Sequence, residues 1–318
     1  MIVFADNKKG ADEVFHLHRQ WERADFSAID PRLLPLVHRL YGEKTAYKNE
    51  SRTLERWSRA FYVQNTSSSH FDLLLELNRQ NLNLPDGILC VAGSGNHFHG
   101  QRGRPWAAEE GNIHLCIHLS PNKRISHYHA GLPVLSAVSI VQAIDTIDGL
   151  EGVAEIKWVN DVLIDGTKVA GFLVHTQSVH DRITTIVLGI GFNVQKTPNI
   201  TPDVFSPKVG SVQDFLPSPA GVTLKEILKQ LLESLDKNYG LLCSGQYHEL
   251  LDFYRKRSAV IGREVHILSD VPGKERTIVS SGIVEKIGDN LELWMEGQNK
   301  PVTEGRLAFA SEGPTDSA

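Results

Sequence analysis

Four β-rich runs follow one another in the middle of the chain, and only short turns separate them. The runs occupy residues 154–159, 162–164, 168–175 and 183–194, with Asn-Asp, Asp-Gly and polar turns between them. Turns this short typically join strands that run antiparallel. The stretch therefore predicts a set of antiparallel neighbouring strands.

The segments on either side of this stretch add further strands and helices. Residues 113–119 alternate apolar and polar side chains with a period of two, which predicts a strand with one apolar face. Residues 61–63 and 88–92 are short apolar runs that we interpret as strands. Helical spacing of apolar residues occurs in four segments, 71–79, 133–147, 224–242 and 246–258.

The two ends of the chain differ from its centre. Residues 11–23 and 31–41 have helical spacing, so we expect residues 1–56 to form a helical extension of unknown role. A DNA-binding helix-turn-helix is the alternative there, but the segment has no basic recognition helix. Residues 57–259 would then form the main domain. The short strands and turns of residues 260–312 predict a small separate barrel, and residues 313–318 a disordered tail.

Composition excludes several classes of protein. The chain has 318 residues, a formal charge of −5 and no long basic run, which argues against non-specific binding of nucleic acid. Its three cysteines are far apart, which suits buried thiols in a reducing compartment. No apolar run approaches the roughly 18–20 residues of a membrane span, and the first residues lack the layout of a signal peptide. We expect a soluble, cytoplasmic protein without membrane contact.

Two short stretches concentrate the chemistry. The first, Gly100-Gln101-Arg102-Gly103-Arg104-Pro105-Trp106, combines glycines, which let backbone N–H groups approach an anion, with guanidinium groups that bind phosphate. The second, Lys157-Trp158-Val159-Asn160-Asp161, is followed by Lys168 after a tight Asp-Gly turn. A phosphate-seeking loop with an Asp/Lys pair indicates a site that handles a nucleotide and activates a carboxylate.

The chain resembles the biotin protein ligases at three motifs in the same order. Their Gly-Arg-x-Trp loop and following Gly-Asn strand correspond to Gly103-Arg104-Pro105-Trp106 and Gly111-Asn112-Ile113. Their Lys-Trp-Pro-Asn-Asp signature with its later Lys-x-Ala-Gly corresponds to 157–161 and 168–171. Their Gly-x-Gly-x-Asn-Val corresponds to 189–194. The resemblance extends from about residue 61 to 309 and leaves residues 1–56 unmatched.

The resemblance implies an α+β fold and a two-step reaction. The fold is a mixed β-sheet with flanking helices, of the biotin/lipoate ligase type and similar to class II aminoacyl-tRNA synthetases, followed by an SH3-like barrel. In the reaction the carboxylate of biotin attacks the α-phosphate of ATP, with Mg²⁺, to give biotinyl-AMP and pyrophosphate. A lysine of a biotin-carrier protein domain then takes the acyl group and releases AMP. Homodimers are common in the family.

The same resemblance assigns roles to residues. Lys168 would neutralise the two reacting anions, Asp161 would orient or deprotonate the incoming lysine, and Arg104 completes the catalytic set. Asn193 would lie near the nucleotide and its Mg²⁺, and Trp106 would cover the ligand once the loop closes. The residues expected at substrate or nucleotide are Ser68, Ser69, His70, His99, Gly100, Gln101, Arg102, Gly103, Trp106, Asn112, His114, Lys157, Asn160, Gly171, Gly189, Gly191 and Asn193.

The sequence also departs from the family pattern in the loop and the pocket. Phe98, His99 and Gln101 stand where the family loop has Gly, Arg and Arg, and the arginine replaced by Gln101 helps to retain the acyl-adenylate. His70 and His114 replace the usual residues of the biotin pocket. Two alternatives to a biotin ligase therefore stay open. One is the same fold acting on another carboxylic acid, either lipoate-like or more polar, and the other is a non-catalytic ligand-binding or sensor protein.

A metal site is a competing interpretation of the histidines. His114, Cys116 and His118 alternate along one strand face, and His97 lies in the preceding loop. Ligands at positions i, i+2 and i+4 with a loop histidine nearby could hold zinc, although the spacing matches no known zinc signature. We expect imidazoles that line a polar pocket instead.

Overall fold

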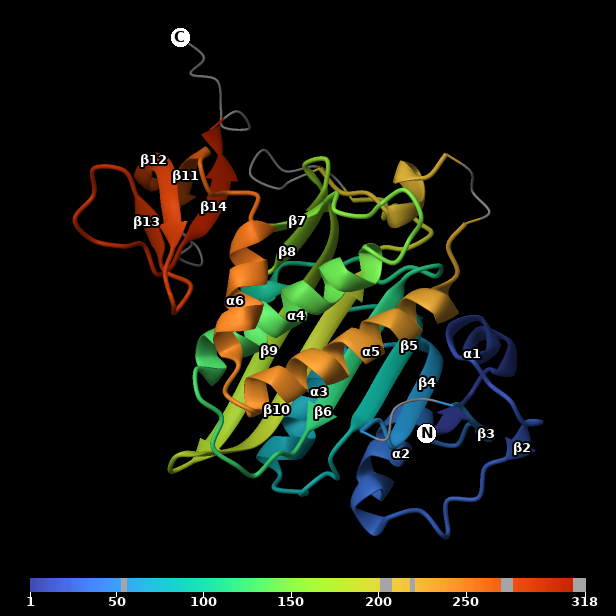
Figure 1. Cartoon of the computed structure of the whole chain (residues 1–318). Helices are drawn as coiled ribbons and strands as arrows, with labels where there is room; N and C mark the ends of the chain where they lie inside the picture. Colours follow the sequence, from blue (N-terminus) through green and yellow to red (C-terminus); the bar gives the residue numbers. More distant parts are fainter. Residues whose placement is uncertain (53–55, 201–207, 218–220, 270–276, 311–318) are drawn as a thin grey trace.

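The computed structural model describes residues 1–52, 56–200, 208–217, 221–269 and 277–310. A twisted ten-stranded mixed sheet runs through the molecule in the order β2-β3-β1-β4-β5-β6-β10-β9-β8-β7 (Figure 1). The strands of its second half are β6 (Ile113–Leu119), β7 (Ala154–Lys157), β8 (Asp161–Ile164), β9 (Thr167–Val179) and β10 (Arg182–Phe192). Every pairing among these five is antiparallel, which confirms the prediction from the short turns.

The first half of the sheet contains its parallel pairs. Strand β4 (Arg59–Thr66) runs parallel both to β1 (Ile2–Ala5) and to β5 (Ile88–Gly95). The outer strands β3 (Tyr47–Glu50) and β2 (Glu22–Arg23) close this side with antiparallel pairing. The sheet is therefore mixed, as predicted.

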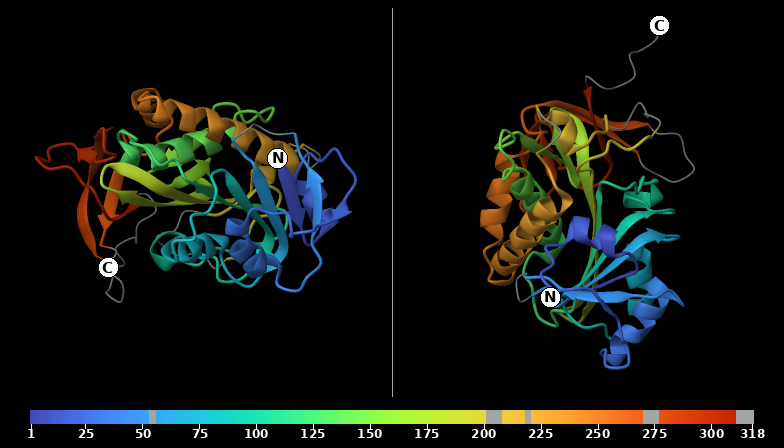
Figure 2. Two further views of the ribbon diagram at one scale, coloured as in Figure 1. Left: turned by 90° about the horizontal axis from the view of Figure 1, so that it is seen from below. Right: turned by 90° about the vertical axis from the view of Figure 1, so that its right-hand side faces the viewer.

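Helices cover both faces of the sheet, which Figure 2 shows in two further views. On one face α4 (Tyr128–Ile144) packs on β7, β8 and β9, and α5 (Leu224–Cys243) and α6 (Tyr247–Lys256) pack on α4. The short α1 (Lys8–Val14) lies on the same face against β4 and α5, and all four helices share one core. On the other face α2 (Leu34–Tyr41) and α3 (His70–Arg79) cover β4 and β5 with a second, smaller core. The four helices predicted in the main domain are confirmed, and each buries its apolar stripe.

The predicted helical extension at residues 1–56 is wrong in its architecture. Among the described residues of this segment, only Lys8–Val14, the 3-10 turn Pro31–Leu33 and α2 are helical, whereas three short strands join the main sheet. The apolar run Ile2–Ala5 forms an inner strand because it pairs with segments far along the chain, a contact that local periodicity does not reveal. The sheet continues without a break across the predicted boundary at residue 56.

A separate four-stranded antiparallel sheet forms the C-terminal domain, as predicted. It consists of β11 (Glu264–Leu268), β12 (Ile278–Ile287), β13 (Leu293–Met295) and β14 (Arg306–Phe309). The Trp158 indole donates to the Leu291 carbonyl at 2.6 Å, which fixes this domain against the turn before β8. The tail at 313–318, predicted to be disordered, lies outside the described residues.

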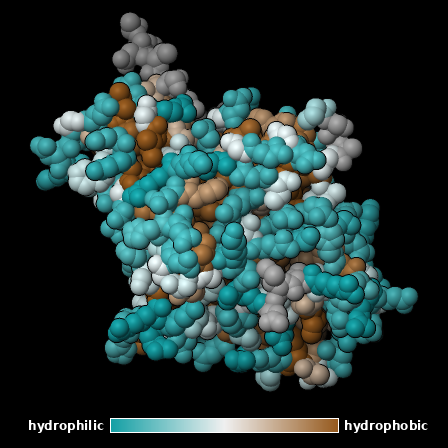
Figure 3. Space-filling model, in the orientation of Figure 1, coloured by the Kyte–Doolittle hydropathy of each residue, from teal (hydrophilic) through white to brown (hydrophobic). Residues whose placement is uncertain are grey.

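The surface is largely hydrophilic, with apolar side chains gathered over the C-terminal sheet (Figure 3). Ile278 and Val279 of β12 are 51% and 61% exposed. None of the helices in the described part of the chain is long and apolar enough to span a membrane.

Candidate active site

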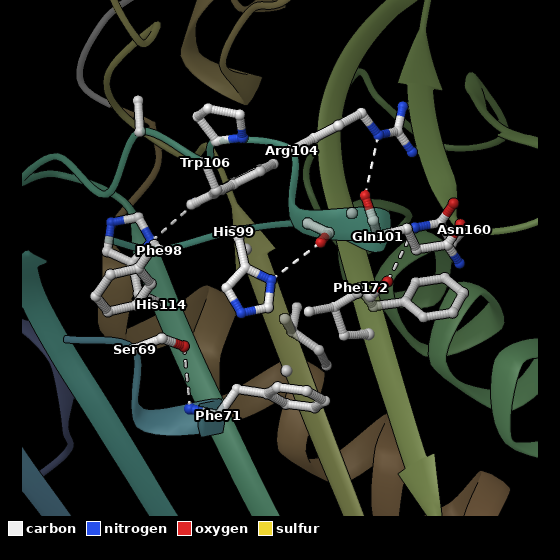
Figure 4. A pocket seen from close by; sticks show the side chains of 18 of the residues that line it. Ser69, Phe71, Phe98, His99, Gln101, Arg104, Trp106, His114, Asn160 and Phe172 are labelled. Carbon is white, nitrogen blue, oxygen red and sulfur yellow. Dashed lines mark hydrogen bonds between the residues drawn. The ribbon is translucent and has the colours of Figure 1, made fainter. Parts of the chain in front are cut away.

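A cavity of about 170 Å³ lies beside β6, β10 and β9, between the start of α3 and the loop that follows β5. The figure of this pocket shows side chains converging on it from the loop, from α3 and from the strands (Figure 4). Fifteen predicted site residues line it: Ser69, His70, His99, Gly100, Gln101, Arg104, Trp106, His114, Asn160, Asp161, Lys168, Gly171, Gly189, Gly191 and Asn193. Arg102 and Lys157 line an adjoining cavity of about 160 Å³ that Arg104 and Asp161 share.

Three other predicted residues lie away from the cavity lining. Asn112 donates to the Lys196 carbonyl at 2.9 Å and accepts from the Val194 amide at 2.9 Å, so it joins two backbone segments. Ser68 is exposed in the β4–α3 turn, and Gly103 forms part of the loop tip with a φ of 73°. These residues shape the backbone around the site.

Lys168 and Asp161 form the charged end of the cavity. The Lys168 Nζ lies 2.6 Å from Asp161 Oδ1, with the two side chains 18% and 13% exposed. Burial alone would raise the pKa of Asp161, but Lys168, with Lys157 and Arg104 nearby, lowers it below its ordinary value. The carboxylate therefore stays ionised at neutral pH. A Cβ at Gly171 would come within 3.2 Å of Lys168 Nζ, so glycine leaves room for the ammonium.

The loop after β5 folds back on itself as a short hairpin. The Trp106 amide donates to the Phe98 carbonyl at 2.9 Å, and the Gly100 amide donates to the Arg104 carbonyl at 2.7 Å. The tip, Gln101–Gly103, turns through a positive φ of 57° at Arg102. In this conformation the Gly100 amide donates within the hairpin and not into the cavity.

His99 ties this hairpin to α3. Its Nε2 lies 2.9 Å from Asp72 Oδ2, and its Nδ1 lies 3.1 Å from the Gly100 carbonyl oxygen. Both nitrogens face acceptors, so the imidazolium form satisfies both contacts. The hydrogen bond to Asp72 raises the pKa of His99 above 6.5, and partial burial opposes that shift.

Trp106 lies across the strand β10. A Cβ at Gly191 would collide with its indole ring, so only glycine allows the ring to lie this close to the strand. The ring centroid is 5.7 Å from Lys168 Nζ, and the indole Nε1 donates to His114 Nδ1 at 3.4 Å. Trp106 therefore separates the charged end from the part of the cavity lined by histidines.

Three buried histidines lie on the α3 side of the sheet, and burial lowers the pKa of each to about 4. His114 accepts from Trp106 and donates through Nε2 to the Glu109 carbonyl at 3.1 Å. His118 has the Pro85 carbonyl and Asn78 Oδ1 each at 3.1 Å from its two nitrogens. His70 has no hydrogen-bond partner at either nitrogen.

The zinc alternative is wrong for the residues named. Throughout the described ranges, which include His97, His114, Cys116 and His118, no group of three or more His, Cys, Asp or Glu side chains is arranged to hold a metal ion. The nitrogens of His114 and His118 are instead bonded within the protein. All three cysteines are free thiols, with Cys90 and Cys116 buried.

Two asparagines complete the polar lining. Asn160 Nδ2 donates to the Phe172 carbonyl at 3.0 Å, which spans β8 and β9. Asn193 Nδ2 donates to the Gly210 carbonyl at 3.0 Å, while its buried Oδ1 has no partner. An oxygen of this kind is a suitable ligand for a hard cation such as Mg²⁺ or an acceptor for a donor on the substrate.

Sequence reasoning missed the apolar walls of the cavity. Phe71, Phe98, Phe172, Leu173 and Ile190 line it together with the polar groups. Apolar residues next to a motif look the same in sequence whether they face a core or a ligand. The one available signal was Phe98, which stands where a glycine is expected.

Residues 61–193 match the model of the "Biotin/lipoate A/B protein ligase family". The bifunctional ligase/repressor BirA of Bacillus subtilis is 32% identical over 162 residues, which are 50% of this chain and 48% of that protein. The biotin--[acetyl-CoA-carboxylase] ligase of Mycobacterium tuberculosis is 27% identical over 250 residues, 76% of this chain and 84% of that one.

Solved structures show the same fold. The biotin protein ligase of Aquifex aeolicus in complex with biotin and ATP superposes with a TM-score of 0.58 at 19% identity, over 79% of this chain and 98% of that one. The alignment with the Bacillus subtilis relative spans about half of that protein's length. Residues 61–193 are therefore similar to the biotin/lipoate A/B protein ligase family, and the chain shares the fold of the solved biotin protein ligase.

Proposed function

We propose that this protein is an ATP-dependent biotin protein ligase that acts in the cytoplasm. The observation that carries the proposal is one cavity containing the Lys168–Asp161 pair, Trp106 and Asn193. Adenylation brings a carboxylate and a triphosphate together, so the site has to supply positive charge where they meet. The relatives named as biotin ligases, and the Aquifex aeolicus structure with biotin and ATP, support this choice of substrates.

In the first step a carboxylate oxygen of biotin attacks the α-phosphorus of ATP. The new P–O bond forms as the bond to pyrophosphate breaks, giving biotinyl-AMP. The ammonium of Lys168 would stabilise the negative charge shared by the carboxylate and the α-phosphate, and Arg104 would add charge at the phosphates. Asn193 Oδ1 fits an ion held mainly by the phosphates, and Mg²⁺ when bound would neutralise part of their charge.

In the second step the amine of a carrier lysine attacks the acyl carbon. A C–N bond forms, the C–O bond to AMP breaks, and the amine loses a proton. Asp161 could either orient the incoming lysine or accept its proton. Its lowered pKa favours the orienting role, because a carboxylate with a low pKa is a weak base and accepts a proton poorly. Its contact with Lys168 would fix the ammonium in place. The proposed acceptor is a biotin-carrier domain.

The test is incubation with ATP, Mg²⁺, biotin and a biotin-carrier domain. A biotinylated lysine and one pyrophosphate per transfer are the expected products. Release of pyrophosphate with another carboxylic acid but not with biotin would show the same chemistry on a different substrate. Tight binding of biotin without any pyrophosphate release would instead identify a sensor, and it would reject the proposal.

A further inference from the structure

The turn between β7 and β8 leads directly into the charged end of the cavity, and a helix outside the main sheet holds it. Asp161 is the first residue of β8, and its carboxylate lies 2.6 Å from Lys168 Nζ. The hydroxyl of Tyr254, on α6, donates to the Val159 carbonyl at 3.1 Å, two residues before Asp161. The position of this turn therefore depends on a side chain that lies away from the reacting groups.

A second contact joins the same turn to the C-terminal domain. The indole of Trp158, the residue before Val159, donates to the Leu291 carbonyl in the turn between β12 and β13. That C-terminal turn is itself bonded to α6, because Arg255 donates to Asp289 Oδ1 at 2.8 Å. Helix α6 and the C-terminal domain thus form one support behind the β7–β8 turn.

Asp161 depends on this support because it lies at the end of a short hairpin. Strands β7 and β8 pair over four residues each, and the pair of Lys157 with Asp161 is the last before the turn. The ends of paired segments open more easily than their centres. A displacement of about 1 Å in a group that positions a reaction can lower the rate a hundred-fold. A small movement of the turn would therefore be felt at the contact between Asp161 and Lys168.

Tyr254 is suited to be a permanent hydrogen-bond donor. Its side chain is fully buried, and burial raises its pKa, with smaller contributions from Tyr247 and from the charge of Asp161. The hydroxyl therefore stays protonated throughout the pH range in which the protein would work. A phenylalanine would fill the same space in the core, so the specific contribution of the tyrosine is its bond to the Val159 carbonyl.

We propose that Tyr254 is a positioning residue of this enzyme, which holds Asp161 against Lys168 through its hydrogen bond to the Val159 carbonyl. This inference rests on the proposed function and adds to it a residue outside the cavity. Tyr254 does not line the cavity, so it acts on the turn and not on the substrate. The bond between Trp158 and Leu291 makes the C-terminal domain part of the same support.

The experiment compares Tyr254→Phe with Tyr41→Phe in the full chain. Tyr41 is the matched control, because it is a buried tyrosine on α2 whose hydroxyl also donates to a backbone carbonyl, that of Tyr62, at 3.3 Å. Each variant loses one hydrogen bond of a buried hydroxyl, so both melting temperatures should fall by about 2–4 °C. We expect kcat for biotin-dependent pyrophosphate exchange, per folded molecule, to fall about ten-fold in Tyr254→Phe alone. The KM values for biotin and ATP should stay within about two-fold of wild type.

The pH profile of kcat separates positioning from a loss of stability. Asp161 is faced by Lys168 on β9, Lys157 on β7 and Arg104 in the loop, and these cations lower its pKa although burial opposes them. If the turn moves in Tyr254→Phe, the carboxylate moves away from Lys168, burial prevails and the pKa of Asp161 rises. The carboxylate then becomes protonated at a higher pH, so the acid limb of the profile should move up by about one pH unit. The control variant should keep the profile of the wild type.

The outcomes also separate this inference from the proposed function. Equal kcat values in wild type and Tyr254→Phe would overturn the role of Tyr254, as would an equal fall in both variants with an unchanged pH profile. Exchange by the wild type is measured in the same series. If another acid supports exchange and biotin does not, the proposed function fails, and the two variants are compared with that acid. If no acid supports exchange, both proposals fail.

Discussion

The two ends of the cavity solve the problem of burying polar groups in opposite ways. At one end Lys168 and Asp161 are charged and already paired, 2.6 Å apart. At the other end His70 is neutral and has no partner. A paired charge is in place before any ligand arrives, which suits a group that has to stabilise a reaction. An unpaired neutral group is satisfied only by the correct ligand, which suits selection.

The largest effect should come from breaking the charged end. Lys168→Ala removes the ammonium and leaves Asp161 buried beside an empty space. We expect adenylate formation, followed as biotin-dependent pyrophosphate exchange, to fall about a thousand-fold. Lys48→Ala is the matched control, because Lys48 pairs with Glu22 at the far edge of the sheet. Activity within a few-fold of wild type in Lys168→Ala would contradict the assignment.

The neutral end can be tested through the pH dependence of stability. Burial lowers the folded-state pKa of His70, His114 and His118 from 6.5 to about 4, so the unfolded chain binds more protons in between. Each histidine's share of the unfolding free energy is intact above pH 6.5. It is lost as pH falls towards 4, by up to about 1.4 kcal/mol per pH unit.

Urea denaturation at pH 4.5 to 7 measures this slope. His70→Leu should make it shallower by one histidine's share. A stability that does not change over this range would contradict the buried, neutral state of these rings.

Trp106 separates the two ends of the cavity, and Gly191→Ala should displace its indole ring. The added methyl group would collide with the Trp106 indole and displace it from β10. We expect about a ten-fold loss in kcat/KM for biotin, and a change in tryptophan fluorescence. The matched control is Gly240→Ala in α5, where an added Cβ would meet no neighbouring atoms.

The smallest effect should come from breaking the contact between His99 and Asp72, which holds the loop over both ends of the cavity. Because the pKa of His99 is raised, its pairing with Asp72 is complete below pH 6.5 and is lost as pH rises through the raised value. Asp72→Asn should increase KM a few-fold below pH 6.5 and have less effect at pH 9. A KM whose pH profile is the same in both proteins would show that the pairing does not position the loop.

Much of the fold and of the charged end could be predicted from the sequence. The strands between residues 154 and 194 are neighbours in the chain and are joined by short turns, so their antiparallel pairing follows from the local sequence. The three motifs predicted that Lys168, Asp161 and Trp106 share one site, and all three line the same cavity. The neutral end could be predicted only in part. His70 and His114 were both candidates, but only the three-dimensional contacts distinguish the satisfied ring from the unpaired one.

Residues 1–56 were the least predictable part for a related reason. Strand β1 has four residues and pairs with β3 and β4, neither of which is adjacent to it in the chain. The helical spacing of apolar residues correctly predicted α2, but it did not indicate the strands of this segment.

The position of β1 between β3 and β4 has a practical consequence for anyone who wishes to isolate the part of the chain that the family model matches. A shortened chain that starts near residue 57 would lose four residues of backbone pairing along β4. Strand β4 would then be the open edge of the sheet, and its buried side chains Phe61 and Val63 would lie at that edge. Open edges of this kind invite self-association. The part of the chain matched by the family model is therefore smaller than the unit whose sheet edge is closed.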